Sequence, residues 1–289
     1  MKIDYPLNFI KVDSISEVGA ILNNLDLSSN NYVIISGPTK SLSISASLIE
    51  VLKHKPVKTY KVDINFHKNI DRTFHEVLRL DVNCIISIGG GVVTDFAKRL
   101  AYLSKLKLIS IPTTVSNDGM ASPIAVLSEN KRKTSLIGKM PDIIIVPLEI
   151  LKQAPLKFIK AALLDTLSNV SAVNDWHYAD KQVYLNNSNS MAISLSKMAA
   201  SMVLNIKNLS LKDNRILNCA LDVQLLSGMS MTIAGSSRPC SGSEHIISHA
   251  LDELNIAENI LHGEKVGTIA EFTLFLQGKE DENVSRLLR

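Results

Sequence analysis

The chain is poor in aromatic residues, in cysteine and in net charge. Aromatic residues make up 5% of its 289 residues and include one Trp, so few rings are available to stack on nucleic-acid bases. The formal charge of +3 is too small to indicate a nucleic acid or a membrane surface as partner. Cys84, Cys219 and Cys240 form no Cys-x-x-Cys pair, which argues against a disulfide framework and a thiolate zinc site.

Targeting signals and membrane spans are also lacking. We recognise no signal peptide, and no apolar run approaches the roughly 18 residues of a membrane span. We therefore expect a cytoplasmic protein without membrane insertion. Hydrophobic residues make up 46% and charged residues 20%, which favours a large buried core over disorder.

Short apolar runs alternate with helical patterns in the first half of the chain. Strands are expected at 32–36, 57–62, 83–88, 106–111 and 143–146, and helices at 42–52, 73–80 and 95–103. This alternation predicts a parallel sheet covered by helices on both faces, with ligands at the carboxyl ends of its strands.

Long helical patterns replace this alternation after Pro147. They cover 161–176, 190–209 and 216–234. The sequence therefore predicts an α/β N-terminal domain with a parallel sheet at 1–150, which would bind a nucleotide, and an all-α C-terminal domain at 151–289.

A run of three glycines follows the third strand. Gly89, Gly90 and Gly91 open a helix, where main-chain N–H groups and the helix dipole favour a pyrophosphate. The run is not Gly-x-Gly-x-x-Gly and does not follow the first strand, so a tight turn without a ligand is the alternative. Asp95 and Lys98 lie on one face of this helix, as a solvated ion pair or as residues that order the phosphate loop.

A polar loop follows the fourth strand. It carries the hydroxyls of Thr113, Thr114, Ser116 and Ser122 and the carboxylate of Asp118. Such a loop is either the capped start of a helix or a binding loop. Its wealth of small polar groups favours binding.

Three of the seven histidines fall within 245–262. His245 and His249 are four residues apart, so they share one face of a helix, and His262 opens the sequence His-Gly-Glu. Imidazoles gathered in this way suit zinc or iron(II), which usually takes one carboxylate as well. The alternative is that the histidines cap helices or line a polar surface, but three in this pattern favour a metal.

Together these motifs resemble those of the iron-containing alcohol dehydrogenase and dehydroquinate synthase superfamily, and within it the sn-glycerol-1-phosphate dehydrogenases. The motifs are Gly89-Gly-Gly…Asp95-x-x-Lys98, Ser116-Asn-Asp-Gly-Met-Ala-Ser-Pro123, Asp165-x-x-Ser-Asn169, Gly235-Ser-Ser-Arg-Pro-Cys-Ser-Gly-Ser-Glu-His245 and His262-Gly-Glu. The similarity extends over nearly the whole chain. It implies an oxidoreductase of phospholipid biosynthesis that interconverts dihydroxyacetone phosphate and sn-glycerol 1-phosphate with NAD or NADP.

The resemblance also implies roles for individual residues. Asp165, His245 and His262 would hold Zn²⁺, or Fe²⁺, as a Lewis acid. His249 and Asp165 would be catalytic and, with Asp118, would contact the substrate. The residues expected to bind the cofactor are Gly37, Thr39, Gly89, Gly90, Gly91, Val92, Val93, Asp95, Lys98, Thr113, Thr114, Ser116 and Ser122.

Two assignments rest on charge. Arg238 is our candidate for the substrate phosphate, because a guanidinium offers a bidentate fork, although a surface arginine at a turn is an equal alternative. Many relatives carry an Asp after the first strand that would repel a 2′-phosphate. Here Gly37 stands there with Lys40 close by, which permits NADP as well as NAD, while Asp63 could still reach a ribose.

Departures from the family pattern leave alternatives open. Asn117 replaces a usual His, and Leu163-Leu164 replaces a small Cys-Gly pair, so the preferred polyol could differ. The alternatives are a glycerol or other alcohol dehydrogenase, a cyclase as the third choice, and a non-catalytic truncated nucleotide-binding paralogue. The complete set of metal ligands argues against the last. We expect a phosphorylated polyol or ketone as substrate, and a homo-oligomer.

Overall fold

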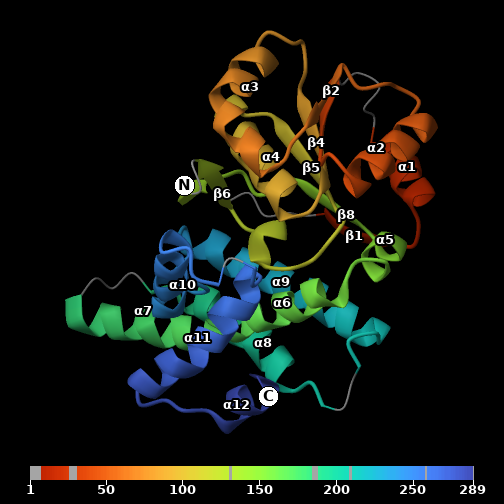
Figure 1. The fold of residues 1–289 in the computed structure, drawn as a ribbon. Helices are drawn as coiled ribbons and strands as arrows, with labels where there is room; N and C mark the ends of the chain where they lie inside the picture. Colours follow the sequence, from red (N-terminus) through yellow and green to blue (C-terminus); the bar gives the residue numbers. More distant parts are fainter. Residues whose placement is uncertain are drawn as a thin grey trace. The chain divides into compact units, whose positions relative to one another are not determined.

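The computed structural model describes residues 8–25, 31–129, 132–183, 188–207, 210–257 and 259–288. The chain folds into two compact units (Figure 1). The sheet unit comprises Lys2–Thr114 and Pro123–Ala154, and the helical unit comprises Val115–Ser122 and Pro155–Arg289. The polar loop at 115–122 therefore clusters with the helical unit, although it precedes the expected boundary in the sequence.

The sheet unit is built on a six-stranded parallel sheet. In the order β1-β8-β5-β4-β2-β3, the strands are Asn8–Val12 (β1), Ile143–Pro147 (β8), Lys107–Pro112 (β5), Cys84–Gly89 (β4), Tyr32–Ser36 (β2) and Lys58–Lys61 (β3). Every residue of β2, β4 and β8 is buried, as expected for strands covered on both faces. The predicted parallel sheet is confirmed.

Helices cover both faces of this sheet. They are α1 (Ile15–Asn24), α2 (Lys40–Val51), α3 (Ile70–Val77) and α4 (Gly91–Ser104), with a short 3₁₀ helix η2 (Ile64–Asn69). The short helix α5 (Leu148–Lys152) follows β8. On one face, Leu22 of α1 and Leu48 of α2 pack into a core with Ile86 of β4. On the other face, Phe96 of α4 packs with Ile85 of the same strand.

The helices after β2 and β4 therefore lie on opposite faces of the sheet. β2 and β4 are neighbouring strands, and the chain proceeds from them in opposite directions, to β3 and to β5. Their carboxyl ends form a topological switch point, the usual ligand site of a doubly wound sheet. Gly37 and Gly89 stand at these two strand ends.

Two features of the sheet unit were not predicted from the sequence. The edge strand β1 pairs with β8 in parallel, and an antiparallel hairpin joins β6 (Ile124–Glu129) to β7 (Arg132–Ile137). Both segments mix polar and apolar residues over five or six positions, so their periodicity is too short to distinguish a strand from a loop.

The other unit is helical. It contains a short 3₁₀ helix η3 (Asp118–Met120) and the helices α6 (Leu156–Leu167), α7 (Asn169–Val183), α8 (Ser190–Leu204), α9 (Asn214–Ala234), α10 (Ser243–Glu253), α11 (His262–Leu276) and α12 (Glu282–Leu288). The prediction of a single helix over 161–176 was wrong, because α6 ends at Leu167. Ser168 caps it, and its hydroxyl donates to the carbonyl of Asp165 at 2.7 Å, a local bond that competes with helix continuation.

Two other predicted helices differ in length from the helices that the structure shows. α8 stops at Leu204, short of the expected 209, and residues 208 and 209 lie outside the described part of the chain. α9 is longer than expected, and within the described residues it alone is long and apolar enough to cross a membrane. The expectation that no run reaches this length was therefore wrong, but 61% of its apolar window is buried inside the fold, so we interpret α9 as a core helix.

Candidate active site

The glycines of the expected cofactor site lie where the sheet provides a ligand site. Gly89 is the last residue of β4, and Gly90 is the N-cap residue of α4. Because glycine has no side chain, Gly90 cannot accept a hydrogen bond from the first N–H groups of this helix. A Cβ on Gly90 would lie 2.7 Å from the Thr114 hydroxyl, and a Cβ on Gly37 would lie 3.5 Å from Val93. The two strand ends and the end of β5 therefore meet closely around the start of α4, a geometry suited to an anion.

Asp95 and Lys98 form a buried ion pair. Their carboxylate and ammonium lie 2.8 Å apart, and the lysine side chain is fully buried. The Lys98 ammonium also donates to the carbonyl of Ile124 in β6. Burial raises the pKa of Asp95, while Lys98 and a backbone hydrogen bond from Val126 oppose the shift. The pair is thus largely shielded from solvent, with the Asp95 side chain 14% exposed, and within the sheet unit it joins α4 to the β6–β7 hairpin.

His67 was not identified from the sequence. Its ring is buried, its Nδ1 accepts from the N–H of Ser128, and its Nε2 lies 2.9 Å from the carbonyl of Val92. Because Nδ1 must accept, the proton is on Nε2, which donates to Val92. This histidine ties the first turn of α4 to the hairpin. A lone histidine in a polar stretch gives no sequence signal for such a contact.

The remaining cofactor candidates fall in both units. Thr39 precedes α2 and is exposed, and Thr113 and Thr114 follow β5 in the sheet unit. Ser116 is half-buried and Ser122 is buried, both in the loop that clusters with the helical unit. Their roles toward a cofactor remain predictions.

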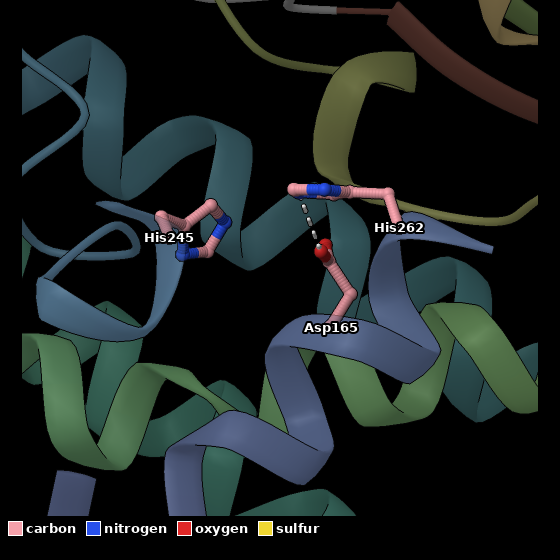
Figure 2. A group of neighbouring side chains, drawn as sticks. All are labelled: Asp165, His245 and His262. Atoms are coloured by element: carbon pink, nitrogen blue, oxygen red, sulfur yellow. Dashed lines mark ion pairs between the residues drawn. The ribbon is translucent and has the colours of Figure 1, made fainter. Parts of the chain in front are cut away.

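Within the helical unit, three elements distant in sequence bring the expected metal ligands together. Asp165 lies on α6, His245 on α10, and His262 is the first residue of α11. One ligand atom from each lies within 4.8 Å of the other two, and Figure 2 shows the side chains pointing toward one another. His262 Nε2 is 3.8 Å from Asp165 Oδ1. One carboxylate and two imidazoles at this spacing match the donor set of a catalytic zinc or iron(II) site.

Close contact between α6 and α11 sets this arrangement. A Cβ on Gly263 would lie 2.0 Å from the carbonyl oxygen of Ala161, and one on Gly267 would lie 2.7 Å from the Cβ of Leu164. The two glycines are four residues apart and so share the face of α11 that rests on α6. Leu164, one of the two leucines that replace the family's small Cys-Gly pair, packs here against the α11 backbone.

The loop that carries Asp118 is held in a similar way. A Cβ on Gly228 of α9 would lie 2.1 Å from the carbonyl oxygen of Ala121, so this loop rests directly on α9. Asn117 caps η3 by accepting from the N–H of Gly119 at 3.0 Å. The N–H of Asp118 donates to Asp165 Oδ2 at 3.1 Å. The structure thus places the expected substrate residue Asp118 directly beside the expected metal ligand Asp165.

The other two substrate candidates differ in position. His249 is half-buried, and its ring stacks on that of His262 with centroids 6.1 Å apart. Arg238 is exposed in the turn between α9 and α10, and among the described residues its side chain has no hydrogen-bond or ion-pair partner. His249 therefore belongs to the cluster, whereas no residue in the described part of the chain holds the guanidinium of Arg238.

Electrostatics in the cluster follow from burial. Burial, and then the neighbouring Asp118 carboxylate, raise the pKa of Asp165 well above its usual range, although His245 opposes the shift. For His245, burial lowers the pKa, but hydrogen bonding and charge from Glu244 outweigh it and raise the pKa. A cation bound among these residues would displace protons from both, because metal ligands must be deprotonated.

The raised pKa of Asp165 predicts how the metal-free protein responds to pH. Native Asp165 keeps a proton that the unfolded chain releases above its ordinary pKa of 3.8. The free energy of unfolding contributed by this group is therefore largest below 3.8 and falls as pH rises through the raised pKa. Urea unfolding across acidic to neutral pH, with a chelator present, would measure it. An Asp165→Asn variant should show a flatter profile, and identical profiles would contradict the prediction.

Comparison with known proteins gives concordant matches. The profile of the iron-containing alcohol dehydrogenases matches residues 9–155. Glycerol-1-phosphate dehydrogenase (NAD(P)+) of Methanosphaera stadtmanae is 35% identical over 277 residues, covering 95% of this chain and 78% of the relative. The enzyme of the same name from Pyrococcus horikoshii is 33% identical over 269 residues, covering 91% and 76%.

Solved structures agree on the fold. A crystal structure of a probable glycerol dehydrogenase from Sinorhizobium meliloti 1021 superposes with a TM-score of 0.77 at 18% sequence identity. The match covers 98% of this chain and 80% of that chain. At this identity the match supports a shared architecture of parallel sheet and helical region, but not a shared substrate.

Proposed function

Since this chain belongs to the glycerol-1-phosphate dehydrogenase family of iron-containing alcohol dehydrogenases, we propose that it interconverts dihydroxyacetone phosphate and sn-glycerol 1-phosphate. The observation that carries the proposal is the convergence of Asp165, His245 and His262 in a chain 35% identical to an enzyme of that name. A nicotinamide dinucleotide would exchange the hydride, and Zn²⁺ or Fe²⁺ would polarise the substrate oxygen as a Lewis acid.

The donor set fits such a cation. Asp165 supplies a buried carboxylate, and His245 and His262 supply neutral imidazole nitrogens once deprotonated. Three protein ligands leave coordination positions free for a substrate oxygen, whereas a structural zinc site uses four. We therefore assign the metal to these three residues.

Other residues of the helical unit are assigned to the substrate. The stacking of His249 on His262 and its partial burial support a role for this ring in relaying a proton or orienting the substrate. Asp118, whose N–H is bonded to Asp165, is placed to accept a hydrogen bond from a substrate hydroxyl. Arg238 remains a candidate for the phosphate on charge alone.

The sheet unit is assigned to the dinucleotide. Gly89, Gly90 and Gly91 at the start of α4 would receive the pyrophosphate, because the helix dipole and uncapped N–H groups favour an anion. The residue after β2 is Gly37, so no carboxylate at this position would repel a 2′-phosphate, and the basic residue Lys40 lies three positions further along the chain. We therefore propose that NAD and NADP are both accepted.

A redox assay tests the proposed reaction. Purified protein loaded with Zn²⁺ or Fe²⁺ is expected to reduce dihydroxyacetone phosphate with NADH and with NADPH. Unphosphorylated dihydroxyacetone serves as the matched substrate, and we expect it to react about tenfold less efficiently or worse, because a hydrogen bond to a charged group contributes about 1.5–3 kcal/mol. Equal efficiency would favour a glycerol dehydrogenase. Stoichiometric metal without turnover of either substrate would favour a non-catalytic protein.

A further inference from the structure

The residue before the first histidine ligand is a fully buried glutamate. Glu244 has no exposed surface, and Oε1 accepts from the N–H of Gly242 at 2.6 Å and lies 2.8 Å from Nδ1 of His245. Oε2 accepts from the hydroxyl of Ser171 on α7 at 2.8 Å. Both carboxylate oxygens are thus engaged within the helical unit, so the carboxylate is fixed in one orientation.

This contact decides which nitrogen of His245 faces the cluster. An ionised carboxylate only accepts hydrogen bonds, so Nδ1 of His245 must carry the proton that bonds to Glu244. The other nitrogen, Nε2, is then left with its lone pair for a cation. A carboxylate on the far nitrogen of a metal-ligating histidine fixes the tautomer and the ring orientation in this way.

The helix that carries both residues is itself anchored to α7. Asp175 accepts from the N–H and the hydroxyl of Ser243, the first residue of α10, at 2.7 and 2.6 Å. Its other oxygen accepts from Gln277 at the end of α11 at 2.7 Å. α7 therefore holds Glu244 through Ser171 and holds the start of α10 through Asp175.

We infer that Glu244 is a positioning residue that sets the tautomer and the orientation of His245 for the cation. The inference rests on the proposed metal site and adds to it a residue that does not itself bind the cation. A purely structural role for Glu244 would stabilise the fold without affecting the ring of His245, so the two roles differ in what they change.

Two variants and a control separate these roles. Glu244→Ala removes every contact of the carboxylate. Glu244→Gln keeps an oxygen for Gly242 and His245 and an amide for the Ser171 oxygen, but loses the charge. Ile246→Ala is the control, because Ile246 follows His245 on α10 and its side chain is exposed, so the substitution leaves the contacts of the His245 ring intact.

The tautomer of His245 is read by ¹⁵N NMR of histidine-labelled, metal-free protein at alkaline pH, with His245→Ala to assign the signals. Zn²⁺ affinity is read by competition with a chromophoric chelator. We expect a proton on Nδ1 in the wild type, in Glu244→Gln and in the control, and a mixture of tautomers in Glu244→Ala. Zn²⁺ affinity should fall about tenfold in Glu244→Gln and about a hundredfold in Glu244→Ala, with no change in the control.

Unchanged Zn²⁺ affinity and an unchanged tautomer in Glu244→Ala would overturn the inference. If that variant does not fold, wild-type Zn²⁺ affinity in Glu244→Gln overturns it instead. Failure of the wild type to bind Zn²⁺ would count against the proposed function, and the tautomer in Glu244→Ala would still decide the inference.

Discussion

Replacing Asp165 by asparagine is expected to abolish stoichiometric Zn²⁺ binding and to lower kcat/KM for dihydroxyacetone phosphate by about a thousandfold or more, since a Lewis acid contributes several kcal/mol of transition-state stabilisation. Asp165 is the only carboxylate among the three assigned ligands, and it is buried. An amide of similar shape preserves the packing but cannot balance the charge of the cation. Elemental analysis and the redox assay would measure both effects.

His262→Ala should give the same double loss, because it removes a ligand while leaving the buried carboxylate intact. His177→Ala is the matched control, since His177 is a half-buried histidine on α7 of the same unit and lies outside the ligand group of Asp165, His245 and His262. The control should keep full metal content and turnover. If Asp165→Asn or His262→Ala keeps both, the site assignment is wrong.

Replacing Gly263 by alanine is expected to damage the site without altering any ligand. The new Cβ would lie 2.0 Å from the carbonyl oxygen of Ala161 and 3.0 Å from the Cβ of Asp165. The nearest atom belongs to the backbone, so α11 must move away from α6. We expect a loss of about 3 kcal/mol in the free energy of unfolding, at the upper end of overpacking costs. His262 precedes this glycine, so Zn²⁺ affinity should also fall.

Urea unfolding with a chelator present and Zn²⁺ competition would measure these two losses separately. Thr268→Ala is the control on the same helix, because Thr268 is exposed and its hydroxyl donates to the carbonyl of Glu264 in the preceding turn of α11. The control should alter stability by no more than about 0.5 kcal/mol. Wild-type stability and affinity in Gly263→Ala would show that the contact with α6 does not set the geometry.

Much of the fold was predictable from local pattern. The runs at Tyr32–Ser36 and Cys84–Gly89 are apolar at nearly every position, so they fit only strands covered on both faces. The break at Ser168 was not predictable in this way, because the apolar pattern continues through it, while the hydroxyl of Ser168 bonds back to the carbonyl of Asp165 at the end of α6. The strands of the β6–β7 hairpin were also not predictable from local pattern, since β6 is held in part by a hydrogen bond from the buried Lys98 ammonium to the carbonyl of Ile124.

Part of the candidate site was likewise predictable from the sequence, and part was not. His245 and His262 were noticed because histidines cluster at 245–262, and Asp165 was added through the resemblance of its motif to the family. The structure brings one ligand atom of each residue within 4.8 Å of the others. The contact of Glu244 with Ser171 was not predictable, because it joins α10 to α7 and depends on how these helices pack.

The sequence alone determined which residue types are available and which segments become strands or helices, because periodicity and side-chain chemistry are local properties. Only the tertiary structure decided which of these residues meet. Gly263 lets α11 pack closely against the backbone of α6 at Ala161, because glycine has no side chain between the two helices. Gly228 of α9 in the same way leaves room for the loop that carries Asp118, which clusters with the helical unit. Such close contacts depend on how whole helices pack together, and a local sequence pattern does not predict that packing.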